Sequence, residues 1–325
     1  MPSNNSQDFA GAQLPRPQAH YVAPLDETPI AAIDVVNVED KPRTVWSDAW
    51  DLMRRRPLFW VSSVLILLII VIAIFPNLFA TVPPNTQCFL ANGNEGPAAV
   101  HPFGFTRQGC VVYSRVIHGA QASVLVGMLA TLMVSLFGAI VGALAGYYGG
   151  WLDAVLSRLG DIFFAIPTIL GAIVLMSVLP ERTPLLVALV IALFAWPQIA
   201  RIMRGAVLSA KQCDFVIAST AVGVSRFRIL LVHVLPNAIA PVIAVATVSL
   251  GTYIVAEATL SFLGLGLPPN VMSWGNDIGQ ARTSILTNPM LMIFPAAALS
   301  ITVLSFLMLG DVVSDALDPK ERSRR

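Results

Sequence analysis

The sequence is poor in charged residues. Its 20 Lys and Arg and 19 Asp and Glu together make up 12% of 325 residues, whereas a water-soluble domain carries about 25%. Hydrophobic residues make up 56%, so too few charges remain to cover a soluble surface of this size, and we predict an integral membrane protein. The formal net charge of +1 provides no positive excess to neutralise phosphates, which argues against a nucleic-acid-binding protein.

The motifs of an enzyme are also missing. No Gly-x-x-x-x-Gly-Lys-Ser/Thr segment is present to cradle nucleotide phosphates, so any ATP must be hydrolysed by another protein. The four histidines, His20, His101, His118 and His233, fall outside the apolar stretches, and none is placed to activate a serine within a membrane span. Cysteine and histidine form no cluster at metal-ligand spacing. We therefore expect no catalytic residue, no metal site and no cofactor bound by this chain.

Six apolar stretches are candidate membrane spans, because a hydrocarbon core about 30 Å thick requires about 20 mostly apolar residues in a helix. They cover residues 58–75, 122–146, 160–179, 185–200, 238–262 and 291–309. Pro167 interrupts the third stretch and Pro197 the fourth, which membrane helices tolerate when neighbours satisfy the freed carbonyl. Small residues recur in the second stretch, including Gly127, Gly138 and Gly142, and would let helices approach closely. The pattern predicts an all-α membrane protein with six transmembrane helices.

The distribution of basic residues predicts the orientation of these spans. With six spans both termini share one side, which carries 15 Lys and Arg when Arg16 in the distal tail is set aside. The opposite loops carry only Arg107, Arg115, Arg182 and Arg282. Because cytoplasmic loops are enriched in Lys and Arg, both termini are expected to be cytoplasmic.

The same pattern divides the chain into segments. Residues 1–44 are rich in Pro, Asn, Gln and Ala without a sustained period, and we expect a disordered cytoplasmic tail. Residues 45–80 contain a juxtamembrane helix and the first span, 81–118 an extracytoplasmic loop, 119–318 the remaining spans, and 319–325 a basic cytoplasmic tail. In the juxtamembrane helix we expect Ser47 as N-cap, with Trp46, Trp50 and Met53 on one face suited to the headgroup zone; an ordinary linker is the alternative.

Residues 201–236 form a long cytoplasmic segment with two short helical runs separated by Gly223. Six apolar side chains in it are expected to face water: Phe215, Val216, Ile217, Val222, Val224 and Phe227. A plain connector would not need them, so we expect a helix-turn-helix projection that docks into a groove of another protein.

This segment resembles the EAA signature of the permeases of ATP-binding-cassette (ABC) importers, in which Glu-Ala-Ala, three residues and Gly precede an Ile-x-Leu-Pro close. Gly223 is followed after nine residues by His233-Val234-Leu235-Pro236. The signature Glu falls on Ile217 and its second Ala on Ser219, so Ala218 and Gly223 are the matching positions. The resemblance implies a coupling helix seated in a cleft of an ATPase subunit. The expected coupling residues are Asp214, Ala218, Ser219, Gly223, Arg226, Arg228, Leu235 and Pro236.

Further motifs resemble the C-type permease subunit of dipeptide, oligopeptide and nickel importers. They are His101-Pro102-Phe103-Gly104, Gly146-Tyr147-Tyr148-Gly149-Gly150-Trp151, Leu260-Ser261-Phe262-Leu263-Gly264-Leu265-Gly266 and Ser273-Trp274-Gly275. The resemblance covers about residues 45–320. It implies the type I ABC importer permease fold, with 119–318 as the permease core, and a multi-pass protein of the bacterial plasma membrane.

The resemblance also implies the partners of the chain. They are a second, B-type permease, one or two ABC ATPase subunits that bind ATP and Mg²⁺, an extracytoplasmic substrate-binding protein and the lipid bilayer. The implied function is ATP-driven, binding-protein-dependent import by alternating access, with a di- or oligopeptide as substrate. Nickel or another small solute is the alternative substrate.

An ion-coupled secondary transporter is the competing class of function. Proton coupling requires ionisable groups within the spans, and the sequence offers Asp161 and Glu257 as candidates for the translocation path. Asp161 has a structural alternative, an ion pair with Arg158, Arg201 or Arg204. Glu257 has one too, a hydrogen bond to a neighbouring helix.

The resemblance further suggests a disulfide in the outer loop. Cys110 and Val111 stand where the family usually has an Arg-Asp pair, and residues 81–100 look like an inserted stretch. A cysteine gained beside an insertion, with Cys88 on the same oxidising side, suggests a Cys88–Cys110 bridge; two free thiols are the alternative. Cys213 on the cytoplasmic side is expected to be unpaired.

Overall fold

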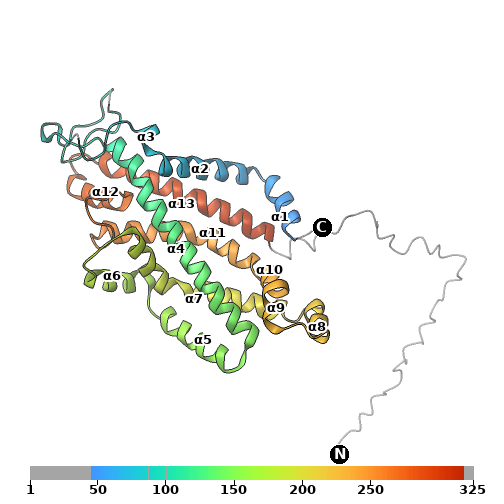
Figure 1. The fold of residues 1–325 in the computed structure, drawn as a ribbon. Helices are drawn as coiled ribbons and strands as arrows, with labels where there is room; N and C mark the ends of the chain where they lie inside the picture. Colours follow the sequence, from blue (N-terminus) through green and yellow to red (C-terminus); the bar gives the residue numbers. More distant parts are fainter. Residues whose placement is uncertain (1–44, 87, 100, 318–325) are drawn as a thin grey trace, which may run out of the picture. The chain divides into compact units, whose positions relative to one another are not determined.

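The computed structural model describes residues 45–86, 88–99 and 101–317, and these residues are mainly helical (Figure 1). The helices long and apolar enough to cross a membrane are α2 (Pro57–Ile74), α4 (Val112–Tyr148), α7 (Pro184–Ala210), α11 (Ala240–Phe262) and α13 (Met290–Leu317). They follow five of the six predicted stretches. Because the expected tail, residues 1–44, and residues 318–325 lie outside the described residues, the predictions for them concern the sequence only.

The remaining span is broken, which differs from the single helix expected over 160–179. It consists of α5 (Gly150–Phe164) and α6 (Thr168–Val178), which are bent by 78° relative to each other. Pro167 lacks a backbone N–H, and its ring disfavours helical geometry at Ile166, so the chain leaves the helix between these two segments. Among the described residues the count is therefore five spans, or six if this bent pair crosses as one.

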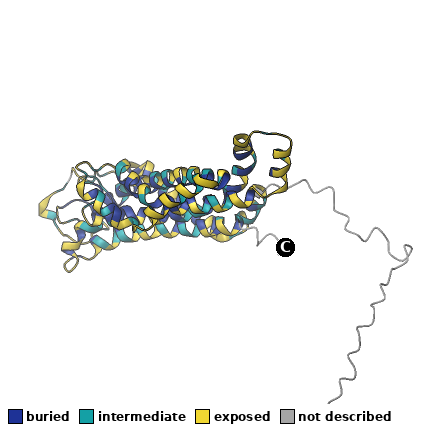
Figure 2. Cartoon of the chain, turned by 90° about the horizontal axis from the view of Figure 1, so that it is seen from below, coloured by how far each residue is buried: buried dark blue, intermediate teal, exposed yellow. Residues whose placement is uncertain are grey.

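The tightest helix packing lies between α4 and α7, and glycines in α4 make it possible. A Cβ atom at Gly142 would lie 2.2 Å from the backbone oxygen of Ala200, and one at Gly138 would lie 2.8 Å from that of Trp196. The absence of side chains thus allows the two backbones to approach, as the small-residue pattern predicted. Figure 2 shows buried residues inside the helical body and exposed residues over its outside, and many of the exposed ones are large and apolar, as at Leu132 and Leu304.

Short elements cap the two ends of the long helices (Figure 1). One end carries α3 (Pro76–Phe79), the turn η2 (Leu90–Asn92), α12 (Trp274–Ala281) and η4 (Arg282–Ser284). The other end, predicted to be cytoplasmic, carries α1 (Val45–Arg54), α8 (Asp214–Ala221), α9 (Arg226–Ile229), the π-helical turn η3 (Leu230–Val234) and α10 (Leu235–Ala238).

The juxtamembrane helix is present as α1, which packs against α13. Ser47 lies inside this helix rather than at its N-cap, because helical structure already begins at Val45. Trp46 and Trp50 are exposed, and an ion pair between Arg56 and Asp315 ties the start of α2 to the end of α13.

Candidate functional site

A projection of two short helices follows α7 at the predicted cytoplasmic end (Figure 1). It comprises α8, a turn at residues 222–225 and α9, and it returns to the spans through η3 and α10. The predicted helix-turn-helix is confirmed. However, the segment begins near residue 211 rather than 201, because α7 continues to Ala210. Arg201 and Arg204 therefore belong to a spanning helix.

The projection exposes four large apolar side chains. Phe215, Ile217, Val222 and Phe227 are 43%, 58%, 84% and 60% exposed. The expectation that Val216 and Val224 also face water is wrong: Val216 is buried and Val224 half-buried, both packed into the main core. The expected coupling residues lie along the projection and the return to the spans. Asp214, Ala218, Gly223, Arg226, Arg228 and Pro236 are exposed, and Ser219 and Leu235 are half-buried.

Gly223 sets the direction of the turn between α8 and α9. Its φ is +85°, in the left-handed region that L side chains rarely adopt, and an added Cβ would meet no atom within 4 Å. Glycine is therefore required here by backbone conformation and not by lack of space.

The projection is fastened to the end of α4. Lys211 Nζ donates a hydrogen bond of 2.7 Å to the backbone oxygen of Tyr147, and the Phe215 ring lies 6.4 Å from the ring of His233. Between α4 and α8 is a cavity of about 550 Å³, lined in part by Tyr148, Ile217 and Arg226. Lys211, which directly follows α7, therefore ties the base of the projection to the end of α4.

Two ion pairs join α5 to α7 near the same end. The Arg204 guanidinium binds both carboxylate oxygens of Asp153, at 2.6 Å and 2.7 Å. Arg201 binds Asp161 at 2.8 Å, and its Cζ lies 3.8 Å from the centre of the Phe164 ring. Asp161, a candidate for the translocation path, thus has a cationic partner in this chain.

Glu257, the other candidate, lies in the packed interior of the spans and has no exposed surface. Ser261 donates to its Oε1 at 2.7 Å, and the hydroxyls of Ser123 and Ser273 also lie beside the carboxyl group. Ser123 Oγ in turn accepts from the backbone N–H of Trp274 at 3.2 Å. This group therefore joins α11, α4 and the N-terminus of α12.

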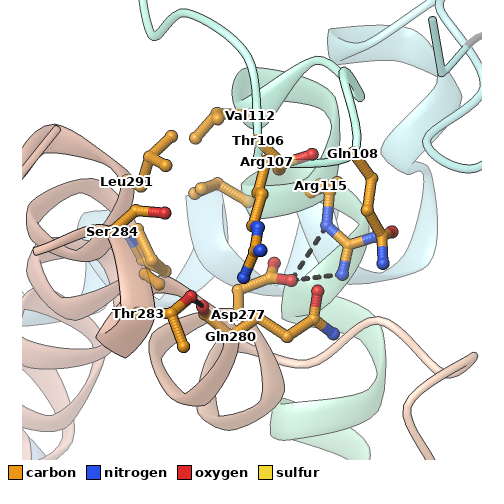
Figure 3. A pocket seen from close by; sticks show the side chains of 13 residues that line it. Thr106, Arg107, Gln108, Val112, Arg115, Asp277, Gln280, Thr283, Ser284 and Leu291 are labelled. Atoms are coloured by element: carbon orange, nitrogen blue, oxygen red, sulfur yellow. Dashed lines mark hydrogen bonds and ion pairs between the residues drawn. The ribbon is translucent and has the colours of Figure 1, made fainter. Parts of the chain in front are cut away.

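The opposite end contains a pocket of about 210 Å³ between the loop before α4 and the α12 to α13 region (Figure 3). Its lining is partly polar and partly apolar. Besides Arg115 and Asp277, the polar lining residues are Thr106, Arg107, Gln108, Gln280, Thr283 and Ser284, and the apolar ones include Val112, Val116, Leu291 and Pro295. The Arg107 side chain is exposed and extends into the pocket (Figure 3).

A buried ion pair between Arg115 and Asp277 closes this pocket. Arg115 Nε donates to Asp277 Oδ1 at 2.9 Å, Nη2 contacts the same oxygen, and Nη1 donates to Asn85 Oδ1 at 2.8 Å. Burial raises the pKa of the Asp277 carboxyl, and the Arg115 guanidinium counteracts that rise. Asp277 was not predicted from the sequence as a site residue, and Arg115 was considered as an outer-loop charge and as part of a Ser114-Arg115 motif that resembles the C-type permease. The available signal was the position of Asp277 directly after the Ser273-Trp274-Gly275 motif.

The outer loop is held in place by a disulfide and by hydrogen bonds to neighbouring helices. Cys88 and Cys110 are joined by a disulfide in the structure, which links two parts of the loop. The Ser284 hydroxyl of η4 donates to Asn94 Oδ1 at 3.2 Å. The loop, which forms one wall of the outer pocket, is thus held against η4.

These features define a multi-pass α-helical membrane protein with a basic helical projection at one end and a structured loop at the other. The chain belongs to the family described as binding-protein-dependent transport system inner membrane component, which matches residues 138–323. The N-terminal transmembrane domain of oligopeptide transport permease C matches residues 44–97. The chain is therefore a permease subunit of an ABC importer and a multi-pass protein of the bacterial inner membrane, as the resemblance implied.

Relatives with an assigned name support this family. The glutathione transport system permease protein GsiD of Escherichia coli O6:K15:H31 (strain 536) is 38% identical over 281 residues, covering 86% of this chain and 92% of the relative. The protein of the same name from Shigella boydii serotype 4 (strain Sb227) is also 38% identical over 281 residues, with the same coverage.

Solved structures support the fold. A chain from inward-facing conformations of the MetNI methionine ABC transporter matches with a TM-score of 0.52 at 23% identity, covering 63% of this chain and 96% of that chain. A second crystal form of the same transporter matches with a TM-score of 0.51 at 20% identity, covering 62% and 96%. At these identities the likeness concerns the fold alone, which is that of a type I ABC importer permease.

Proposed function

We propose that this chain is one of two different permease subunits in an ATP-driven importer of di- or oligopeptides. In this proposal a B-type permease completes the translocation path, one or two ABC ATPase subunits bind ATP and Mg²⁺, and an extracytoplasmic binding protein delivers the substrate. The match of the N-terminal region to oligopeptide permease C supports a peptide substrate. The relatives named for glutathione, itself a tripeptide, support the same class.

The observation that carries the proposal is the set of large apolar side chains exposed on the α8–Gly223–α9 projection. Exposed Phe215, Ile217, Val222 and Phe227 at the predicted cytoplasmic end indicate a protein partner, because large apolar side chains gathered on an exposed projection mark an interaction site. Arg226 and Arg228 add two positive charges to this projection. An ATPase subunit is the partner that fits, since the chain has no phosphate-binding loop of its own.

The contacts behind the projection supply a route for coupling. When the ATPase subunits close on ATP, the projection moves with them, and Lys211 passes the movement to the end of α4. The Arg204–Asp153 pair keeps α5 moving with α7. Such movement of packed helices around a fixed site is the physical basis of alternating access.

Purification of the tagged complex with its ATPase subunits tests the docking surface. Phe227→Asp is expected to abolish co-purification of the ATPase, because a charge would be buried against its cleft. Leu286→Asp is the matched control, since Leu286 is 97% exposed but lies at the opposite end. Equal recovery of the ATPase with both variants would contradict docking at this projection.

The energy source for uptake distinguishes an ABC importer from an ion-coupled secondary transporter. In cells making the complete system, uptake of a labelled peptide is expected to stop on ATP depletion and to survive collapse of the proton gradient. The reverse pattern would support an ion-coupled transporter and overturn the proposal. Uptake of nickel but of no peptide would keep the ABC mechanism and replace the substrate.

A further inference from the structure

The break between α5 and α6 borders a cavity halfway along the spans. Residues 165–167 belong to neither helix, and the Phe163 ring before the break lies 6.3 Å from the ring of Phe194. Phe194 and Gln198 lie near the middle of α7, which runs from Pro184 to Ala210. Ile166, Pro167, Phe194 and Gln198 line a cavity of about 480 Å³. The unwound backbone is therefore at membrane depth.

Unwound backbone at this depth requires polar surroundings. In the described chain the carbonyl oxygens of Ala165 and Ile166 accept no hydrogen bond, and both residues are exposed. Non-helical backbone within a membrane is tolerated only where it is buried in protein or lines a water-filled cavity. Because this chain does not cover the break, we expect it to face an aqueous path.

Two polar side chains, one from α7 and one from α11, face the same cavity without an intramolecular partner. They are Gln198 and Thr252, which are exposed and form no side-chain hydrogen bond within the described residues. An unpaired polar group inside a membrane is costly, and such groups mark functional sites. No charged residue lines this cavity.

We infer that this cavity is a contact site for the amide groups of a peptide in transit, with Gln198 and Thr252 as specificity-determining residues. This inference rests on the proposed function. A peptide backbone presents N–H donors and C=O acceptors along its length. The Gln198 amide, the Thr252 hydroxyl and the free carbonyls at the break complement both. Without charge the site does not hold the peptide termini, so it binds weakly enough to release the peptide, as conduction requires.

The test uses the complete transporter, with its second permease, ATPase subunits and binding protein, reconstituted in liposomes. Uptake of radiolabelled trialanine and glutathione is compared for Thr252→Val, Gln198→Leu and wild type. The loss of one hydrogen bond is expected to reduce uptake or raise KM about two- to tenfold. Thr247→Val is the matched control on the same helix, because the Thr247 hydroxyl donates to the Ile243 carbonyl at 2.9 Å; it is expected to behave as wild type.

Two readouts separate contact with the peptide from a structural role. Wild type is expected to prefer trialanine over trialanine methylated at its peptide nitrogens, and Gln198→Leu is expected to reduce that preference. In a Cys213→Ser background, Gln198→Cys is expected to react with a small cationic methanethiosulfonate reagent, and peptide turnover is expected to slow the reaction.

The outcomes distinguish the two proposals. If wild type transports peptide and both Thr252→Val and Gln198→Leu match Thr247→Val, the contact site is wrong while the proposed function stands. An unreactive thiol in the Gln198→Cys variant would also overturn the contact site, because the cavity would then be dry. If the wild-type complex moves neither peptide but moves another solute, the proposed function fails and the peptide contact site fails with it.

Discussion

Arg115 at the start of α4 and Asp277 in α12 form a buried ion pair although 162 residues separate them in the sequence. Their side chains are only 5% and 9% exposed. The pair therefore fixes α12 against α4 at the outer end, on one side of the outer pocket.

Removal of one partner of this pair is expected to destabilise the protein. Asp277→Ala leaves the Arg115 charge buried without compensation, which costs about 3–5 kcal/mol. Thermal unfolding of the purified complex in detergent should show a clear drop in Tm. Glu181→Ala removes an exposed outer carboxylate and serves as control. Equal Tm values for Asp277→Ala and Glu181→Ala would show that the Arg115–Asp277 pair does not hold the outer end together.

The turn at Gly223 is expected to tolerate no side chain. Gly223→Ala places a Cβ at φ +85°, which costs about 1–2 kcal/mol. Gly223→Pro and Gly223→Asp should abolish uptake while the amount of protein in the membrane stays normal. Gly205→Ala, at an open site inside α7 where an added Cβ meets no atom within 4 Å, should leave uptake unchanged. Normal uptake by Gly223→Pro would rule out the coupling role of this turn.

The outer cysteines are expected to be protected from alkylation. Without reductant, only Cys213, which is exposed and free, should be labelled in the denatured protein, and two further thiols should appear after reduction. Because the bridge closes a loop with a sequence separation of 22, the double variant Cys88→Ser/Cys110→Ser should lose about 3 kcal/mol of stability. Three thiols labelled without reductant would refute the bridge.

The stability of Glu257 variants is expected to follow the ability of the new side chain to accept a hydrogen bond. Glu257→Gln retains an acceptor for the Ser261 hydroxyl, whereas Glu257→Leu removes the acceptor to which that buried hydroxyl donates. The leucine variant should be the less stable by about 1–3 kcal/mol, measured by thermal unfolding of the complex. If Glu257→Gln abolishes uptake while stability is retained, the carboxyl group has a transport role beyond packing.

Local pattern was enough to predict five of the spans, because each depends on a run of apolar residues with little charge. The third span shows the limit of that reasoning. Proline at position 167 signals an interruption, but a helix containing Pro197 continues unbroken in α7. The difference between a tolerated proline and a break depends on the helices packed around each one. Val216 shows the same limit, since its burial depends on the main core beneath α8.

The sequence by itself determined that this protein lies in a membrane, its predicted orientation and its family. Each follows from local quantities: the scarcity of charge, the position of Lys and Arg, and short motifs in order. Only the tertiary structure decided which groups meet. Asp277 with Arg115, Glu257 with its serines, and the cavity beside the α5–α6 break join residues from distant segments, and such contacts depend on how helices pack and not on the residues next to each one in the chain.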